Sequence, residues 1–187
     1  MIKLIGTNHL MSKEAIEGII KDEAPDIICL ELCNFREDAI LNQIKEETKE
    51  TTLLGKITSK IKEKAEKQGM NYGSDQKTAL RYAKNENLQY FLVDMPILKI
   101  QELFSKIPEK EQLGFASELK EFENESIKEV SEEEVLNQLK QRYPTAFEFL
   151  INMRNLYISK ELMKVMRDNP NKRILVFLGK GHVKQIE

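Results

Sequence analysis

Apolar residues gather in four short runs along the chain. These runs predict β-strands at residues 2–5, 27–32, 90–93 and 173–178. The run at 27–32 is almost continuously apolar, which is typical of a strand covered on both faces. Between the runs, apolar residues recur at helical spacing. Strands that alternate with helices predict an α/β fold, with a mainly parallel sheet flanked by helices.

Four helices are expected from the spacing of apolar residues and from the residues that begin and end helices. They cover residues 12–23 (with Ser12 as N-cap), 73–85, 97–106 and a stretch from Pro144 to about residue 168. Residues 35–68 look helical and charge-rich. Glu and Lys also dominate residues 108–142, which predicts a charged helical insertion, an exposed hairpin or arm. No linker or repeat divides the 187 residues, so we expect a single domain, 1–187.

The charges of the chain nearly balance, with 29 Lys and Arg against 31 Asp and Glu, for a net charge of −2. The absence of a basic block and of Trp argues against binding to nucleic acid. No run approaches the roughly 18 apolar residues of a membrane span, and the first residues lack the apolar core of a signal peptide. Cys29 and Cys33 are predicted to be free thiols in a reducing compartment. We therefore expect a soluble, cytoplasmic protein; its oligomeric state stays open.

The two histidines of the chain both follow predicted strands. His9 comes three residues after Gly6, and His182 comes three residues after Gly179. The carboxyl ends of parallel strands meet at one edge of a sheet, where ligands bind. Imidazole is a common metal ligand and a general base near neutral pH. A single histidine in such a position is more often a surface or loop residue, but the shared spacing predicts one joint site.

Carboxylates follow the second and third predicted strands. Glu31 lies within the apolar run at 27–32, where a charge is costly unless it is paired or bound to a metal ion. Two histidines and one carboxylate are a recurrent ligand set for a divalent ion. The alternative is a salt bridge from Glu31 to Arg36 or Arg154. Asp94 is either a site residue or the cap of the helix that begins near Ile97.

Arg154 falls on the apolar stripe of the helix after Pro144. A guanidinium on a core-facing line usually reaches a carboxylate or a bound anion, so Arg154 is a candidate for either a structural pair or a substrate contact. Arg36 could orient Glu31, clamp a substrate carboxylate or simply lie exposed at the start of a helix. The segment from Gly179 to Gly181 reads as a loop and lacks the spacing of a P-loop, which disfavours a phosphate cradle.

Several blocks of the chain resemble the TraB/PrgY/TIKI family, whose wider superfamily includes erythromycin esterase-like and ChaN-like proteins. The most specific blocks are LIGTNHL with APDIICLELCNFR near the start and LVFLGKGHVKQI near the end. TALRYAKNENLQYFLVDMPI and MRNLYISKEL match more weakly, and the blocks together cover about half of the chain. By position, the two G-x-x-H histidines of the family correspond to His9 and His182, its acid to Glu31, and its arginines to Arg36 and Arg154.

The resemblance implies a divalent metal ion and activity against peptides. TIKI members are described as Mn- or Co-dependent proteases, and TraB and PrgY members act against peptide pheromones. Many relatives also have membrane helices after this region. Three departures stand out: Met153 replaces a family Glu, Asp75 stands where Glu is usual, and Gln185 replaces a Gly. The replacement at Met153 weakens the expectation of hydrolysis.

The hypothesis that results is a single TraB-like α/β domain with a metal-dependent, peptidase-like hydrolase site. His9, Glu31 and His182 would hold Mn, Co or Zn, with Asp94 nearby. Arg154 or Arg36 would stabilise an oxyanion or hold a substrate carboxylate. The first alternative is a non-catalytic protein that binds a peptide or small ligand in the same cleft. The second is a structural module whose helical arm forms an interface.

Overall fold

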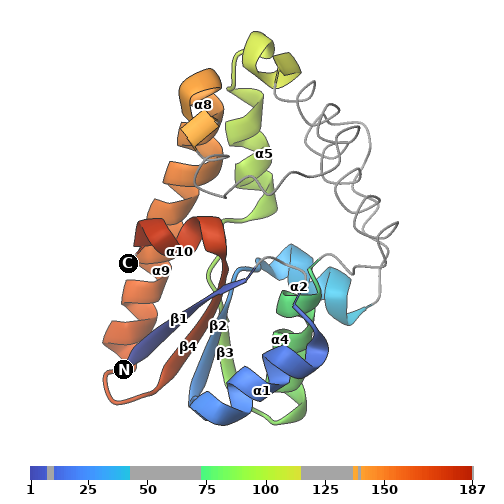
Figure 1. The fold of residues 1–187 in the computed structure, drawn as a ribbon, viewed down its shortest axis with the longest axis vertical. Coiled ribbons are helices and arrows are strands. Elements are labelled where there is room, and N and C mark those ends of the chain that lie inside the picture. The colour runs from blue at the N-terminus through green and yellow to red at the C-terminus, as the bar shows by residue number, and fades with distance from the viewer. Residues whose placement is uncertain (8–10, 43–72, 115–136, 139, 187) are drawn as a thin grey trace.

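The protein has an α/β fold built on four parallel strands (Figure 1). The computed structural model describes residues 1–7, 11–42, 73–114, 137–138 and 140–186. The strands are β1 (Ile2–Thr7), β2 (Ile27–Leu30), β3 (Gln89–Leu92) and β4 (Ile174–Gly179). Each coincides with one of the predicted apolar runs to within a few residues. The predicted fold class is therefore confirmed.

The strands lie in the order β1-β4-β2-β3, and all neighbouring pairs are parallel. The last strand of the chain thus lies inside the sheet, and all six of its residues are buried. Leu30 at the end of β2 pairs with Phe177 of β4, so the residues that follow these two strands meet at the same edge. The sequence pattern had left the strand order open.

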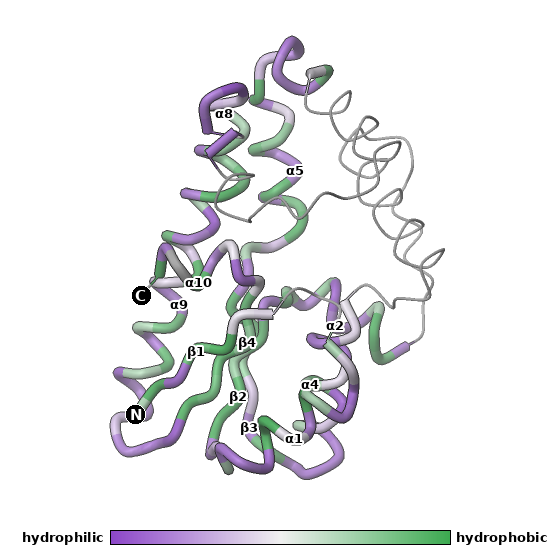
Figure 2. The backbone as a smooth tube through the Cα atoms, viewed as in Figure 1, coloured by the Kyte–Doolittle hydropathy of each residue, from purple (hydrophilic) through white to green (hydrophobic). Residues whose placement is uncertain are grey.

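Helices cover both faces of the sheet. On one face lie α1 (Lys13–Glu23), whose N-cap is Ser12 as predicted, and α4 (Ser74–Asn85). On the other face lie α9 (Met153–Asp168) and α10 (Lys180–Ile186). Alternate residues of the inner strands point to opposite faces, as the period of two in a strand requires. Leu30 and Phe177 belong to the first core cluster, and Cys29 and Val176 to the second. Figure 2 shows the resulting layer of hydrophobic segments within the sheet.

A second group of helices extends beyond the carboxyl edge of the sheet (Figure 1). It contains α5 (Ile97–Ser105), α8 (Pro144–Phe147) and η1 (Glu148–Asn152). The helix expected after Pro144 is present, but η1 makes a π-helical turn before α9 begins. α2 (Asn34–Leu41) follows β2 at the same edge. The predicted arm at about 108–142 falls largely outside the described residues.

Two local features differ from the sequence prediction. The segment expected to be a loop after β4 instead begins α10 at Lys180, which places His182 in the first turn of a helix. The first strand, predicted to end at residue 5, continues through Gly6 to Thr7; a Cβ atom on Gly6 would lie 3.1 Å from Cγ of Lys180, so this glycine allows β1 and α10 to approach each other. None of the helices in the described part of the chain is long and apolar enough to cross a membrane.

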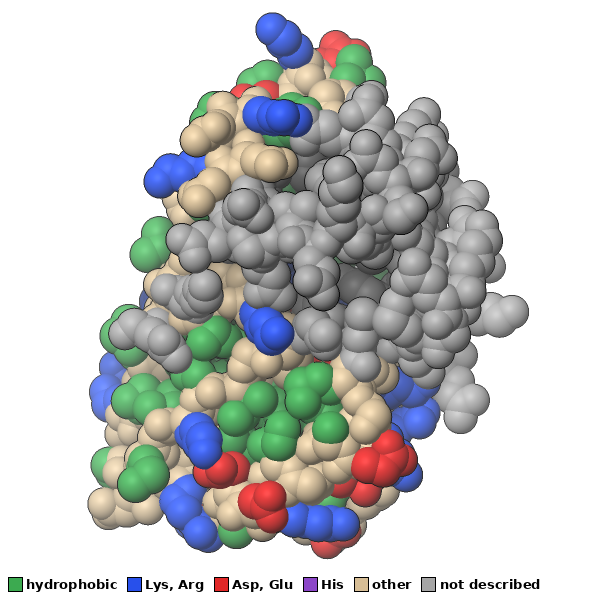
Figure 3. Space-filling model, viewed as in Figure 1, with side chains coloured by type: hydrophobic (Ala, Val, Ile, Leu, Met, Phe, Trp, Pro, Cys, Tyr) green, Lys and Arg blue, Asp and Glu red, His purple; other side chains and the backbone are tan. Residues whose placement is uncertain are grey.

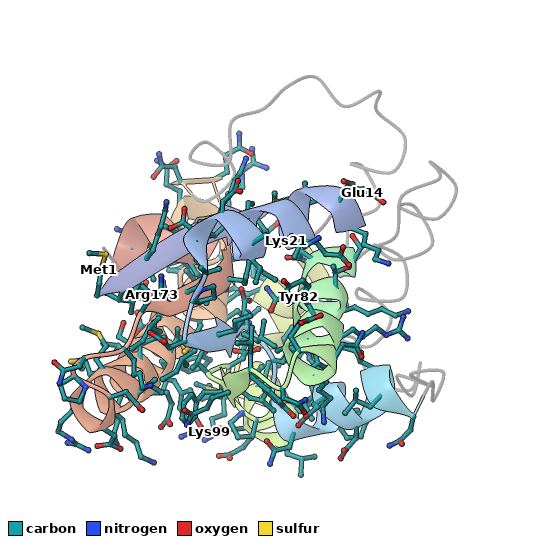
Figure 4. The ribbon with its side chains drawn as sticks, turned by 90° about the horizontal axis from the view of Figure 1, so that it is seen from below. Met1, Glu14, Lys21, Tyr82, Lys99 and Arg173 are labelled. Atoms are coloured by element: carbon teal, nitrogen blue, oxygen red, sulfur yellow. The ribbon has the colours of Figure 1, made fainter. Side chains whose placement is uncertain are left out.

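The surface agrees with a nearly balanced charge. Figure 3 shows Lys, Arg, Asp and Glu side chains interspersed around an apolar patch on the face that carries β1 and α1. A small hollow lies at the amino-terminal edge of the sheet, where Met1 and Arg173 come together (Figure 4). Its charged side chains are paired, Lys3 with Glu23 and Arg173 with Asp26. The described site candidates all lie at the opposite edge.

Candidate functional site

Four polar side chains from separate segments meet beyond the carboxyl ends of the strands. Glu31 follows β2, Asp94 follows β3, Arg154 lies in the first turn of α9, and His182 lies in the first turn of α10. Hydrogen bonds and ion pairs link them in one cluster. Arg36, from the first turn of α2, joins the cluster through Asp94. The structure therefore brings together every predicted site residue that it describes.

Glu31 is the central carboxylate of this cluster, and only 5% of its surface is exposed. Its Oε2 atom accepts a hydrogen bond of 2.6 Å from the backbone N–H of Gly179, and its Oε1 atom accepts one of 2.9 Å from Arg154 Nη2. Burial of a carboxylate is tolerable when donors of this kind replace water. The salt bridge to Arg154, which was the alternative to a metal-binding role for Glu31, is thus present, while Arg36 pairs with Asp94 instead.

Asp94 anchors both arginines. Its side chain is fully buried and accepts three hydrogen bonds of 3.0–3.1 Å from Nε and Nη2 of Arg154. Arg36 Nη1 lies 3.2 Å from Oδ2, and the N–H of Met95 lies 2.7 Å from Oδ1. Asp94 does not cap α5, because that helix begins after Pro96. A carboxylate surrounded by so many donors is suited to positioning guanidinium groups.

Arg154 remains charged in this setting. Burial by itself would lower its pKa, but the negative charges of Asp94 and Glu31 outweigh burial and raise the pKa above its ordinary value. The guanidinium uses Nε and Nη2 for these two carboxylates. Within the part of the chain that the structure describes, Nη1 makes no hydrogen bond. The cluster therefore contains a fixed positive charge, and the Nη1 donor of Arg154 is not used by the described residues.

His182 is held from both sides of its ring. Nδ1 bonds to the side-chain oxygen of Asn155, while Nε2 lies 3.3 Å from Oε1 of Glu31. An amide oxygen only accepts hydrogen bonds, so Nδ1 must be the donor. In a neutral ring, Nε2 then presents a lone pair to the carboxylate. Two facing acceptors repel each other, so a cation bound between Nε2 and Oε1 would stabilise this geometry.

Asn155 and Gln185 extend this arrangement, and sequence reasoning did not identify either as a site residue. The side-chain amide of Asn155 donates to Oε1 of Gln185, which leaves its oxygen directed at His182. Asn155 is 94% buried within a helix, an unusual place for a residue that favours caps and turns. An asparagine next to the core-facing Arg154 was the signal that could have revealed it.

A second buried network supports the backbone of Glu31. Thr7 donates to the fully buried carboxylate of Asp75, and Gln76 Nε2 donates to Asp75 and to the carbonyl of Phe177. Gln76 Oε1 accepts the N–H of Glu31 at 3.0 Å. In the sequence, Asp75 stood out only as an Asp where the family usually has Glu. The network joins β1, α4, β2 and β4, and so fixes the position from which the Glu31 side chain extends.

The proposed metal ligand set is only partly described. His9 lies outside the described residues, so its position relative to Glu31 and His182 is not given by the structure. Among the residues that the structure does describe, no group of three or more His, Cys, Asp or Glu side chains is arranged to hold a metal ion. Glu31 and His182 alone supply two adjacent donor atoms.

Comparison with known proteins adds a distant relative. No protein-family model matches the chain. The chain is similar to an uncharacterised protein of Methanocaldococcus jannaschii, with 27% identity over 210 aligned positions. The match includes 99% of this chain and 52% of the relative, so the chain spans about half the length of that protein. These findings establish no family, and the resemblance described from the sequence stays a prediction.

Proposed function

We propose that the protein is a divalent-metal-dependent hydrolase of the TraB/TIKI type that acts on a peptide. The observation that most favours this function is the pair formed by His182 Nε2 and Glu31 Oε1, which lie 3.3 Å apart at a buried edge of the sheet. His9 is the proposed third ligand. The proposed compartment is the cytoplasm, which the free, buried thiols of Cys29 and Cys33 favour.

The donor atoms of the site fit a metal ion such as Zn, Mn or Co. A metal-bound histidine usually donates its other N–H to an oxygen that fixes the ring, and Asn155 accepts such a bond from His182. Bonds of about 2.0–2.2 Å to one ion place neighbouring N and O ligands roughly as far apart as Nε2 and Oε1 are here. A cation held by Glu31 and His182 would remove the repulsion between these two acceptors.

In this proposal the side chains around the ion have separate roles in hydrolysis. A bound ion would polarise a peptide carbonyl and lower the pKa of a water molecule on it. Arg154 stays charged, and its Nη1 atom makes no hydrogen bond to the described residues, so it can stabilise negative charge that develops on a substrate oxygen. Asp94 holds this guanidinium in place by three hydrogen bonds. Asn155 keeps Nε2 of His182 as an acceptor.

The test combines metal analysis with cleavage of a mixed peptide library in the presence of Mn²⁺, Co²⁺ or Zn²⁺. The wild-type protein is expected to bind the metal and cleave peptides, whereas Glu31→Gln and His182→Gln lose both properties. Glu102→Gln is the matched control, because Glu102 lies on α5 as an exposed carboxylate whose ion-pair partner is Lys106. If wild-type protein binds no metal and cleaves nothing, the proposal is wrong.

One observation favours the second candidate, a protein that binds a peptide without cleaving it. Glu31 and Asp94 already receive hydrogen bonds from Gly179, Arg154 and Arg36, so the cluster is electrically compensated as it stands. A compensated cluster can hold a ligand with no chemical step. Turnover separates the two functions: a binding protein saturates with its peptide at one-to-one stoichiometry and leaves the peptide intact.

A further inference from the structure

Arg36 is the arginine of the cluster whose donors are least used. It lies in the first turn of α2 and reaches Asp94 through Nη1 alone, at 3.2 Å. Nε and Nη2 make no hydrogen bond to any residue in the described part of the chain. The side chain is 33% exposed, while the carboxylate that anchors it is fully buried. Asp94 thus fixes Nη1 of Arg36, while Nε and Nη2 have no partner among the described residues.

The two arginines approach Asp94 in different ways. Arg154 uses its Nε–Nη2 edge, which gives paired contacts to both carboxylate oxygens. Arg36 contacts Asp94 through Nη1 alone, and its own Nε–Nη2 edge makes no hydrogen bond to the described residues. That edge carries two parallel N–H groups spaced to match the two oxygens of a carboxylate. Among the described residues nothing occupies this pair of donors, which can therefore receive a carboxylate in the cluster that contains Glu31 and His182.

The charges around Arg36 also favour an anion. Arg36 and Arg154 balance Asp94 and Glu31, so the cluster is neutral while His182 is neutral. A cation at His182 and Glu31 would leave a positive excess that an anionic group can offset. The amino end of α2 adds partial positive charge, since its N-cap, Cys33, makes no side-chain capping bond. Cation and anion are therefore expected to strengthen each other's binding.

We propose that Arg36 is the carboxylate-binding residue of this site, and that the peptide is held by a carboxylate group while its scissile region lies near Glu31 and His182. This inference rests on the proposed function in placing a peptide at this edge. The carboxylate can belong to the C-terminus of the peptide or to an acidic side chain. Both sources present the same two oxygens to the guanidinium.

Nuclear magnetic resonance of arginine Nε–H groups tests the inference without requiring catalysis. The probes are N-acetylglycine, which imitates a peptide C-terminus, and N-acetyl-aspartic acid α-amide, which imitates an acidic side chain. N-acetylglycinamide has no carboxylate and is the matched negative probe. The resonance of Arg36 Nε–H is expected to shift saturably with at least one carboxylate probe. The probe that binds more tightly shows whether the site prefers a peptide C-terminus or an acidic side chain. The exposed Arg81 on α4 supplies a control resonance that should not move.

Addition of Zn²⁺ is expected to tighten carboxylate binding by about fivefold or more, in the range of ordinary coupling between sites. Arg36→Lys keeps the charge but loses the paired donors, and should weaken binding by about tenfold. The inference is overturned if Arg36 fails to respond, if the amide probe shifts it equally, or if inorganic phosphate binds far more tightly than both carboxylates. A protein that binds carboxylate at Arg36 but cleaves nothing would refute only the hydrolase. One that cleaves peptides without a response at Arg36 would refute only this subsite.

Discussion

Asp94→Asn removes one negative charge from the most buried part of the cluster and leaves the shape of the side chain almost unchanged. Among the described residues, Arg154 then keeps Glu31 as its only charged partner, at 2.9 Å, and loses charge-assisted bonds at three contacts with Asp94. Arg36 loses its anchor at the same time. The substitution therefore isolates the contribution of the anchor without creating a cavity.

The structure sets the size of the expected effect. Loss of one partner from a buried pair costs about 3–5 kcal/mol, because the remaining charge is left uncompensated in the interior. The retained amide oxygen and the remaining Glu31 place Asp94→Asn near the lower end, at about 3 kcal/mol. The part-exposed contact with Arg36 adds less than about 1 kcal/mol. A domain with about 5–15 kcal/mol of stability should still fold.

Urea unfolding followed by far-ultraviolet circular dichroism measures this loss, since the chain has no Trp to report by fluorescence. Glu31→Gln should cost less, about 1–3 kcal/mol, because Gln can still accept the N–H of Gly179. Glu102→Gln breaks only an exposed pair and should cost under about 0.5 kcal/mol. If Asp94→Asn costs no more than Glu102→Gln, the account of a buried anchor is refuted. If Asp94→Asn does not fold, Asp94→Asn combined with Glu31→Gln and Arg154→Met should restore folding, because the three mutually paired buried charges are then removed together.

Three further predictions concern other parts of the molecule. Burial raises the pKa of the Cys29 thiol to about 12, so the folded state keeps a proton that the unfolded chain loses above its ordinary pKa of 9.0. Between about pH 8.5 and pH 10, the wild type and Cys33→Ala should thus lose about 1 kcal/mol more unfolding free energy than Cys29→Ala; equal losses in urea titrations would contradict this. Ser12→Ala removes the cap of α1 and should cost about 1 kcal/mol by the same method, whereas Ser12→Asp should retain most of the stability. Asn155→Leu should change the tautomer equilibrium of His182 in nitrogen NMR spectra and weaken metal binding by about 10–100-fold, and unchanged spectra would argue against a positioning role.

The sequence predicted the elements of this fold well because their periodicity is strong. All four strands and the helices α1, α4, α5 and α9 follow from apolar runs and helical spacing. The position of β4 between β1 and β2 did not follow, because periodicity does not specify which strands pair. Gly179 and Gly181 look like loop residues in the sequence, yet α10 begins between them. The π-helical turn at η1 also breaks the uniform stripe, so Ile151 is only partly buried.

The charged residues of the site could be predicted because each carries its own signal. Glu31 interrupts an apolar run, Asp94 ends a strand, and Arg154 lies on a core-facing helical line. The supporting residues could not be predicted in this way. Gln76 and Asn155 are neutral polar residues within helices; the place of Asn155 beside Arg154 signals burial, but the roles of both residues depend on which strands and helices meet in space. Their partners are far away in the chain, at Glu31 and His182.

The central claim is that Glu31 and His182 bind a divalent cation at the carboxyl edge of the sheet. A titration of metal-free protein with Co²⁺, followed by the visible absorption of the bound ion, tests it most directly. The account predicts uptake of about one equivalent by the wild type and by Glu102→Gln, and loss of the saturable signal in Glu31→Gln and in His182→Gln. A wild-type protein that takes up no Co²⁺, or a Glu31→Gln variant that binds it with wild-type affinity, would contradict the claim.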